Sequence, residues 1–438
     1  MNQVQSVTIS PPEWAQGRYL DEAGCCRSFL TRYPMQYVEG RFYGLDGPIS
    51  EDRLRKLLYD YLQGIVFSGI STKISALVEV LKMECQAESL PEPQNRICCA
   101  NGSFLVFENR FVPKKEICRH RLPIAYNPDA PRPRRWETFL EELLEPEDIL
   151  TLQEFMGYCL LPINFAQKML LIIGEGGEGK SRVGIVLSHL LGSNMVNGSL
   201  SKLETSPFAR ADLQGRLLLV DDDLRLEGLR STNYLKTIIT AEQPLDLEKK
   251  GLQSYQGKVN CRLMAFGNGS LRALHDRSYG FFRRQIILTA KPRDPHRVDD
   301  PYLAGTLFKE LPGILLWCME GLYRLLGQQM QFTLSQRSRE NLHLAMTEGN
   351  NTPDFLASQG YIRPDSCGSI PSRKLYELYC QWCHDNALSP LPSRTFISAV
   401  TRQAPALGIR YDTNIDDGNG RRVRGFTGIR AQSPFTRV

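Results

Sequence analysis

One glycine-rich segment constrains this chain more than any other. Residues 168–181 read Lys-Met-Leu-Leu-Ile-Ile-Gly-Glu-Gly-Gly-Glu-Gly-Lys-Ser, so an apolar run ends abruptly at Gly174, and a helix-like segment, 183–191, follows. Glycines let successive backbone N–H groups turn inward around a polyphosphate, and the helix behind them presents its positive N-terminal end to the same anion. The order of strand, glycine turn and helix therefore predicts a phosphate-binding loop and a nucleotide-binding protein.

The spacing gives each polar residue of this loop an expected role. Lys180 would reach the β- and γ-phosphates of ATP, and the Ser181 hydroxyl would ligate Mg²⁺. Other loop residues would surround the phosphates; they are Gly174, Gly176, Gly177, Glu178 and Gly179.

The composition is that of an ordinary globular protein. The chain has 438 residues, of which 42% are hydrophobic and 23% charged, and this length is enough for two or three domains. No apolar run approaches the length of a membrane span, and the polar start, residues 1–10, lacks the basic head of a signal peptide. We therefore expect a cytoplasmic protein without membrane contact.

The twelve cysteines have no disulfide-scaffold spacing, and in an intracellular protein we expect them to be reduced. Cys380-Gln-Trp-Cys383-His384 matches the spacing of haem attachment, and its two cysteines could form half of a zinc site. Because this segment continues a helical pattern of apolar residues, we expect neither haem nor metal there.

Further apolar segments follow the glycine loop. Residues 216–220, 262–266 and 285–288 are candidates for buried strands, and helical stretches alternate with them. This alternation predicts an α/β fold with a mainly parallel sheet. The expected parts are an N-terminal α+β accessory region at 1–130, a helical linker or collar at 131–167, an ATPase domain at 168–330 and a C-terminal domain at 351–432.

One strand candidate ends in adjacent carboxylates, since residues 217–222 read Leu-Leu-Leu-Val-Asp-Asp. At such a strand end one acid holds Mg²⁺, and the next polarises the attacking water as a general base. Paired acids favour a hydrolase over a phosphotransferase, which must keep water away from the γ-phosphate. Alignment of the strand end assigns Asp221 to the metal and Asp222 to the base, with Asp223 as an alternative shifted by one residue.

Two more polar signals flank strand candidates. Asn268 follows residues 262–266 and would sense the γ-phosphate and orient the water, although Asn-Gly is also a common turn signal. Arg283 and Arg284 precede residues 285–288. They are either surface ion-pair partners or the fingers of a ring-forming ATPase, in which an arginine enters the neighbouring subunit's site and contributes about 10³–10⁵ in rate.

Together these motifs resemble the superfamily-three helicases, and most closely the phage and plasmid primase–helicase family, which is related to the poxvirus primase–helicases. The resemblance covers the chain from about Asn101 onward, and its specificity comes from the order of several motifs. It implies an AAA+-like phosphate-loop ATPase that forms a ring, usually a hexamer, binds ATP between subunits and moves 3′→5′ along single-stranded DNA. The motifs are, in chain order, 136–140, 152–160, the glycine loop, 217–222, Asn268, Arg284 and 311–322.

The resemblance also assigns residues between the acidic pair and Asn268. The family has a threonine-glycine-acid element and a lysine hairpin that grips DNA phosphates, and Thr240-Ala241-Glu242 and Lys249-Lys250 look similar here. Exposed lysine pairs are, however, often only solvated. Aspartate stands where the family usually has a glutamate base, which leaves the choice between Asp222 and Asp223 open. No primase domain is evident, so a primase would be a separate partner.

The positive charge gathers at the C-terminal end. From residue 394 onward the chain has eight arginines and three acids, which accounts for its whole net charge of +5. Helical patterns at 371–384 and 393–403 precede a hairpin signal at 417–420, an order typical of a winged helix, which this family also often carries. The residues expected to bind duplex DNA are Arg394 and Arg402 on the recognition helix and Arg421, Arg422 and Arg424 on the wing.

The function predicted from these observations is an ATP- and Mg²⁺-dependent replicative DNA helicase of a phage, plasmid or other mobile element, acting as a homo-oligomeric ring. The alternative is an origin-binding initiator or regulator in which ATP switches assembly without processive unwinding. A small-molecule kinase is disfavoured by the acidic pair and the basic C-terminal end.

Overall fold

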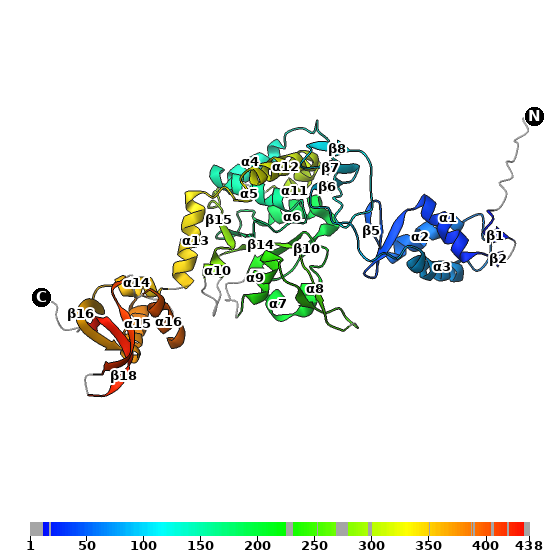
Figure 1. The fold of residues 1–438 in the computed structure, drawn as a ribbon. Helices are drawn as coiled ribbons and strands as arrows, with labels where there is room; N and C mark the ends of the chain where they lie inside the picture. Colours follow the sequence, from blue (N-terminus) through cyan, green and yellow to red (C-terminus); the bar gives the residue numbers. More distant parts are fainter. Residues whose placement is uncertain are drawn as a thin grey trace, which may run out of the picture. The chain divides into compact units, whose positions relative to one another are not determined.

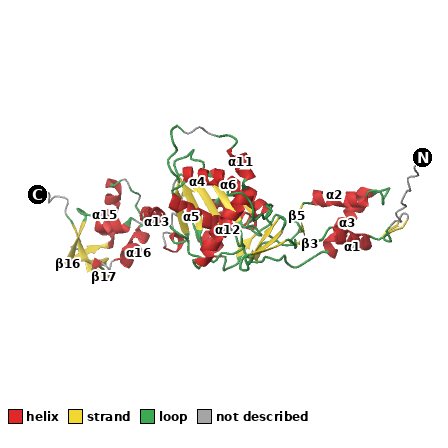
Figure 2. Cartoon of the chain, turned by 90° about the horizontal axis from the view of Figure 1, so that it is seen from above, coloured by secondary structure: helices red, strands yellow, loops and turns green. Residues whose placement is uncertain are grey.

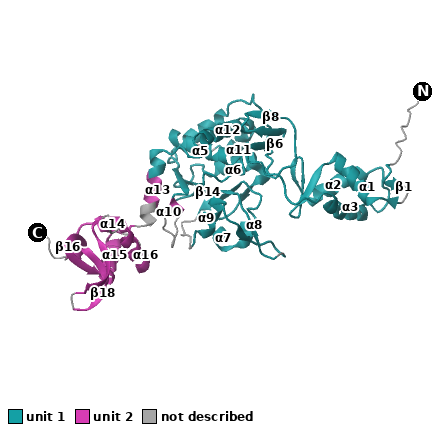
Figure 3. Cartoon of the chain, in the orientation of Figure 1, with its two compact units in different colours: residues 1–271, 283–339 teal, residues 272–282, 340–438 magenta. Residues whose placement is uncertain are grey.

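The computed structural model describes residues 12–432 except 17–18, 225–230, 252, 269–278, 297–299, 350, 387, 389, 404–406 and 418–419. The chain divides into two compact units, drawn in teal and magenta in Figure 3. The first unit contains residues 1–271 and 283–339, and the second contains residues 272–282 and 340–438.

The first unit begins with a small module of helices and short strands. Its three helices share one apolar core, in which Phe29, Leu58 and Leu77 are fully buried. Asp21 and Ser50 cap the first two helices, because each side chain accepts a hydrogen bond from a backbone N–H of the first turn. The elements are β1 (Ala15–Gln16), β2 (Tyr19–Leu20), α1 (Glu22–Arg32), β3 (Met35–Val38), β4 (Arg41–Gly44), β5 (Gly47–Ile49), α2 (Glu51–Leu62) and α3 (Ile70–Glu84).

A three-stranded antiparallel sheet follows, made of β6 (Arg96–Cys99), β7 (Gly102–Leu105) and β8 (Arg110–Val112). Its buried residues Ile97 and Phe104 belong to the same core as the sheet that carries the glycine loop. That core therefore starts near residue 97, whereas the sequence analysis placed a boundary at 130. The apolar pattern of such short strands does not reveal which core they face.

The centre of the first unit is a five-stranded sheet in which every pairing is parallel, in the order β10-β11-β14-β9-β15. This confirms the predicted α/β fold with a parallel sheet. The interior strands β9 and β14 are almost entirely buried because helices cover the sheet (Figures 1 and 2). The strands are β9 (Met169–Ile173), β10 (Met195–Asn197), β11 (Leu218–Leu224), β14 (Arg262–Gly267) and β15 (Gln285–Thr289).

Helices and one hairpin connect these strands. α6 packs closely on the sheet because Gly184 has no side chain, and a Cβ there would lie 2.9 Å from the Phe266 ring. The connecting elements are α6 (Ser181–Leu191), the short helix η1 (Gly192–Asn194), α7 (Leu200–Thr205), α8 (Pro207–Ala211), α9 (Asn233–Thr240) and the antiparallel hairpin β12 (Leu245–Leu247) with β13 (Tyr255–Gly257). A further helix, α11 (Leu303–Lys309), follows the last strand.

Three further helices, α4 (Arg134–Leu143), α5 (Pro146–Tyr158) and α12 (Leu311–Gly327), complete the central core. α5 and α12 touch backbone to backbone. A Cβ on Gly157 would lie 2.3 Å from the Cys318 carbonyl oxygen, and one on Gly321 would lie 2.3 Å from the Gln153 carbonyl oxygen. The two glycines therefore set how closely these helices approach.

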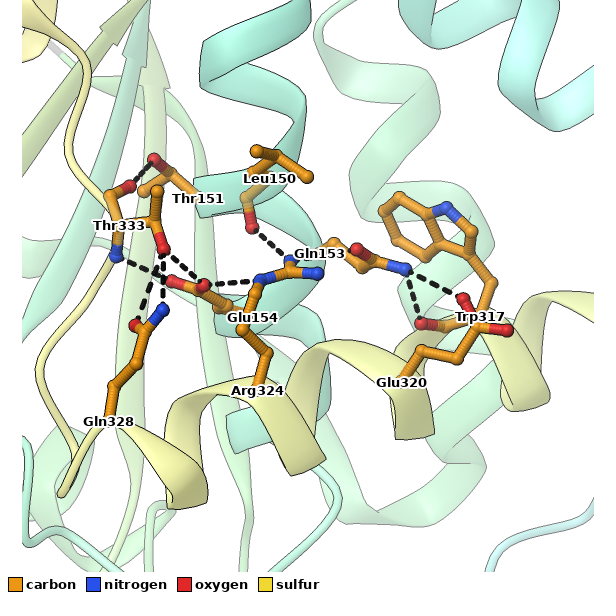
Figure 4. A network of polar contacts seen from close by, with 9 residues as sticks. All are labelled: Leu150, Thr151, Gln153, Glu154, Trp317, Glu320, Arg324, Gln328 and Thr333. Carbon is orange, nitrogen blue, oxygen red and sulfur yellow. Dashed lines mark hydrogen bonds and ion pairs between the residues drawn. The ribbon is translucent and has the colours of Figure 1, made fainter.

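A buried polar network joins the same two helices to the segment that follows α12 (Figure 4). The Glu154 carboxylate is fully buried and accepts hydrogen bonds from Arg324 Nε at 2.6 Å and from the Thr333 backbone N–H at 2.7 Å. Arg324 also donates to the Leu150 carbonyl oxygen at 3.0 Å and to Gln153 Oε1 at 2.8 Å. Because its carboxylate has a cation and an N–H as partners, Glu154 is satisfied in the core.

The second unit contains a three-stranded antiparallel sheet, ordered β16-β18-β17, with three helices against it. The rings of Tyr379 and Phe396 stack in its core with centroids 4.1 Å apart. The predicted hairpin is formed by β17 and β18, although residues 418–419 of its turn lie outside the described residues. The elements are α10 (Tyr279–Phe282), α14 (Thr352–Ala357), β16 (Ile362–Pro371), α15 (Ser372–Asp385), α16 (Ser393–Gln403), β17 (Arg410–Asp416) and β18 (Arg422–Ala431).

α13 (Gln336–Gly349) extends from the first unit into the second. Among the helices of the described residues, none combines the length and the apolar character that a bilayer span requires.

Candidate nucleotide-binding site

The glycine loop leaves β9 at the carboxyl edge of the parallel sheet and leads into α6. Gly176, Gly177 and Gly179 have φ angles of +115°, +81° and +104°, which L-residues with a side chain rarely adopt. At Gly174 a side chain would instead be crowded, because a Cβ there would lie 2.6 Å from Glu178 Oε1 and 2.8 Å from Lys180 Nζ. The loop is thus shaped by backbone conformations and close approaches that only glycine permits.

Lys180 and Glu178 form a buried ion pair inside this loop. Lys180 Nζ lies 2.6 Å from Glu178 Oε2, and the residues are 7% and 3% exposed. Glu178 Oε1 accepts hydrogen bonds from the backbone N–H of Gly176 at 2.7 Å and from that of Glu175. Burial raises the pKa of Glu178, but the hydrogen bonds from Lys180 and the backbone outweigh this effect and hold the pKa below its ordinary value.

A cavity of about 1240 Å³ opens beside the loop, and several predicted residues meet in it. Asn268 reaches it from the end of β14, which is tied to the loop by a 3.0 Å hydrogen bond from Gly174 N–H to the Gly267 carbonyl oxygen. The predicted residues that line the cavity are Gly176, Gly177, Glu178, Gly179, Lys180, Ser181, Asp222 and Asn268. The cavity thus gathers the polar ends of three adjacent parallel strands.

The three aspartates of β11 differ in environment. Asp221 is 6% exposed, and its Oδ2 accepts a hydrogen bond from Leu200 N–H at 2.8 Å at the start of α7. Burial raises the pKa of Asp221 above its ordinary value, although hydrogen bonds from backbone N–H groups oppose that shift. Asp222 and Asp223 are exposed. Asp222 and Asp223, and not Asp221, therefore line the cavity.

The donor set suits a magnesium ion bound to a nucleotide. Ser181, Asp222 and Asp223 supply a hydroxyl and two carboxylates to the cavity, and Mg²⁺ prefers oxygen ligands completed by water and phosphate. In the described part of the chain no three His, Cys, Asp or Glu side chains gather into a group that could hold a metal alone.

Arg283 and Arg284 lie at the opposite edge of the sheet. The Arg284 carbonyl oxygen accepts a hydrogen bond from Met169 N–H at 2.8 Å, at the start of β9, whereas the glycine loop follows the end of β9. β9 spans Met169–Ile173, at about 3.3 Å per residue. The two arginines therefore do not line the nucleotide cavity of their own subunit.

Lys168 adds a third cation at this edge, and the sequence analysis had no signal for it. Its Nζ donates a hydrogen bond to the Arg283 carbonyl oxygen. Burial and the charges of Arg283 and Arg284 lower the pKa of Lys168.

Arg293 is a cavity residue that the sequence analysis missed. It follows β15, and its Nη1 would lie 3.4 Å from a Cβ on Gly177, so its side chain lies over the glycine loop. Lys291, on the same segment, lines the cavity and lies 3.4 Å from a carboxylate oxygen of Glu145. The available signal was a pair of basic residues just beyond a parallel strand, where ligands gather.

The predicted lysine hairpin is a hairpin in the structure. Lys249 and Lys250 lie between its strands β12 and β13. Lys250 is exposed, and Lys249 Nζ lies 5.6 Å from the centroid of the Tyr255 ring. Their contact with DNA remains a prediction.

In the second unit, three of the five arginines predicted to bind DNA line one surface hollow of about 660 Å³. Arg394 and Arg402 reach it from α16 and Arg424 from β18, together with hydroxyl side chains that include Ser393 and Thr401. Arg421 and Arg422, beside the hairpin turn, are exposed outside this hollow.

Fold and site define the chain as an α/β protein with a glycine loop and a polar cavity at the carboxyl edge of a parallel sheet. Residues 30–145 match a family described as D5 N terminal like, and residues 172–284 match a family of unknown function, DUF5906. The second match begins in β9, just before the glycine loop, and ends at Arg284. The first begins well upstream of Asn101, where the resemblance in motif order starts.

Solved structures of the NrS-1 C-terminal region share the fold. Two A-form apo structures and a further apo structure superpose with TM-scores of 0.53, 0.52 and 0.54. Each is 11% identical in sequence to this chain, and the match covers 93% of this chain and at least 99% of the NrS-1 chain. This identity establishes the fold alone. The D5 N terminal like match supports a replication-associated protein.

Proposed function

We propose that this protein is an ATP-dependent DNA helicase that serves the replication of a phage, plasmid or other mobile element. One observation carries the proposal: the glycine loop, two carboxylates and an amide from three neighbouring strand ends line a single cavity. Such a cavity combines the phosphate donors, metal ligands and water-positioning group that nucleotide hydrolysis needs.

Each of these residues has a chemical task. Lys180 and the loop N–H groups bind the β- and γ-phosphates, and Ser181 and Asp222 hold Mg²⁺, which when bound neutralises charge on the phosphates. Asp223 accepts a proton from the attacking water, and Asn268 orients that water. This assignment replaces Asp221 and Asp222 by Asp222 and Asp223, because the Asp221 carboxylate is already bound to Leu200 N–H.

The position of Arg284 supports an assembly of several subunits. Arg284 lies at the edge of the sheet opposite to the glycine loop, so a catalytic role for it requires the site of another copy. A ring, most simply a hexamer, brings Lys168, Arg283 and Arg284 of one subunit to the phosphates of the next. Arginine at that position stabilises charge in the transition state.

Two basic surfaces are proposed to hold DNA. Lys249 and Lys250 contact the phosphates of a single strand during 3′→5′ movement. The second unit has the order of helices, strands and hairpin of a winged helix, and its arginine hollow binds duplex phosphates. This hollow also favours the second candidate function, an origin-binding initiator in which ATP switches assembly.

Fork unwinding and ATP hydrolysis, each measured with purified protein, separate the two candidates. Hydrolysis that single-stranded DNA stimulates, together with strand separation, supports the helicase, and both activities should be lost in Lys180→Ala. Lys202→Ala, which removes an exposed lysine outside the cavity, is the matched control. Hydrolysis without unwinding, combined with tight duplex binding, would support the initiator.

A further inference from the structure

The Glu178 carboxylate occupies the anion position of its own glycine loop. Oε1 accepts from Gly176 N–H at 2.7 Å and from Glu175 N–H, and Oε2 lies 2.6 Å from Lys180 Nζ. The residue is only 3% exposed. These are the same kinds of donor, backbone N–H groups and the loop lysine, that a nucleotide phosphate requires.

The loop is built closely around this carboxylate. A Cβ on Gly174 would lie 2.6 Å from Glu178 Oε1 and 2.9 Å from its Cδ, so the absence of a side chain at Gly174 makes room for the carboxylate. Lys180 and the loop N–H groups stabilise the ionised form, which is why the pKa of Glu178 lies below its ordinary value despite burial. Glu178 is therefore an anion, held at the high effective concentration of an intramolecular ligand.

We propose that Glu178 is a built-in competitor for the phosphate position of the loop, so that a single phosphate group binds negligibly and only a ligand with further contacts, a magnesium-bound nucleoside triphosphate, binds well. This inference rests on the nucleotide site of the proposed function. A carboxylate and a phosphate cannot both accept from the same few N–H donors, so every ligand must first displace Glu178.

Ligands differ in the contacts that they make with the cavity once Glu178 is displaced. Orthophosphate only replaces the hydrogen bonds that Glu178 had made, so its binding brings little net free energy. A triphosphate reaches further into the cavity, toward Asn268 and Arg293, and its metal reaches Ser181 and Asp222. These added contacts offset the loss of the Glu178 interactions, so only a polyphosphate with its metal binds well.

Calorimetric titration of Glu178→Gln tests the proposal, because glutamine keeps the shape of the side chain and removes its charge. Orthophosphate and the slowly hydrolysed analogue ATPγS with Mg²⁺ are titrated at constant ionic strength. We expect Glu178→Gln to bind orthophosphate at least about tenfold more tightly than the wild type, since a charged hydrogen-bonded competitor is lost. The affinity for Mg·ATPγS should rise by a similar factor, because both ligands displace the same carboxylate, and orthophosphate binding should thereby become measurable.

Glu175→Gln is the matched control, since Glu175 is an exposed carboxylate of the same loop and its loss changes the loop charge equally. It should leave the affinity for orthophosphate unchanged. Glu178→Ala provides a second variant, with folding of each variant verified by circular dichroism, and should also gain affinity for orthophosphate.

Equal or weaker orthophosphate binding in both Glu178 variants would overturn the inference, because it would mean that Glu178 only orients Lys180. The same result in Glu175→Gln and Glu178→Gln would also overturn it, since general charge repulsion would then be sufficient. A wild-type protein that binds no Mg·ATPγS would instead refute the nucleotide site itself. The two failures are therefore distinguishable.

Discussion

Exchanging the aspartates of β11 one at a time tests which of them serve the nucleotide. Asp222 and Asp223 line the cavity, whereas the Asp221 carboxylate is bound to Leu200 N–H at 2.8 Å. We therefore expect Asp222→Asn and Asp223→Asn each to lower kcat for ATP hydrolysis by about 10²–10⁴, because each removes a metal ligand or the base. Asp221→Asn should retain most of the activity.

The stability of Asp221→Asn follows from the same geometry. Asparagine keeps an oxygen for Leu200 N–H, and the weaker neutral acceptor costs about 1 kcal/mol. Burial raises the pKa of Asp221, so the wild type loses stability as the pH rises from the unfolded to the folded pKa of this carboxyl. At pH values above the folded pKa, the wild type has a buried negative charge at Asp221 that asparagine lacks. The absence of this charge offsets the weaker hydrogen bond of the variant.

Two measurements on each variant check this prediction: steady-state hydrolysis with single-stranded DNA present, and urea unfolding at pH 7 and at pH 4. Asp212→Asn, at an exposed aspartate outside the cavity, is the control. An inactive Asp221→Asn beside active Asp222→Asn and Asp223→Asn would refute the reasoning and restore the assignment made from the strand end.

Three further predictions concern assembly, DNA and stability. Mixing Arg284→Ala with Lys180→Ala subunits should restore part of the hydrolysis that each lacks alone, because some interfaces then hold an intact loop and an intact arginine; unchanged inactivity would contradict a shared site. Arg394→Ala and Arg424→Ala should each weaken duplex binding in a filter or anisotropy assay and reduce its salt slope by about one, whereas Arg373→Ala, at an exposed arginine of α15, should not. Glu154→Ala should destabilise the central core by about 3–5 kcal/mol, since it leaves the Arg324 charge without its partner, and should lower Tm. Glu108→Ala, which breaks an exposed ion pair with Arg110, should change Tm little.

The positions of the strand ends explain why several residues of this site could be predicted from the sequence. Parallel strands place their carboxyl ends at one edge, so Lys180, Asp222 and Asn268 were predictable as neighbours without knowledge of the strand order. The parallel sheet itself was predictable because each buried strand is an apolar run.

Other features depend on contacts that spacing does not encode. The burial of Asp221 was not predictable, because β11 continues to Leu224 with an irregularity between these residues, so the strand does not end where its apolar run ends. Glu178 folds back onto N–H groups of its own loop, and Arg293 reaches the loop from a later strand. The module at 12–85 gave weak signals, because its strands are short and its core is small.

The backbone contact between α5 and α12 limits where this chain can be truncated without loss of the central core. Gln153 and Gly321 lie more than 150 positions apart in the sequence, yet the Gln153 carbonyl oxygen leaves no room for a methyl group on Gly321. A polypeptide truncated before α12, which begins at Leu311, would leave α5 with its apolar side bare and Glu154 without Arg324. The minimal piece that folds around the glycine loop therefore extends past α12 to Thr333, whose backbone N–H donates to Glu154. During synthesis this core is complete only once that residue has left the ribosome.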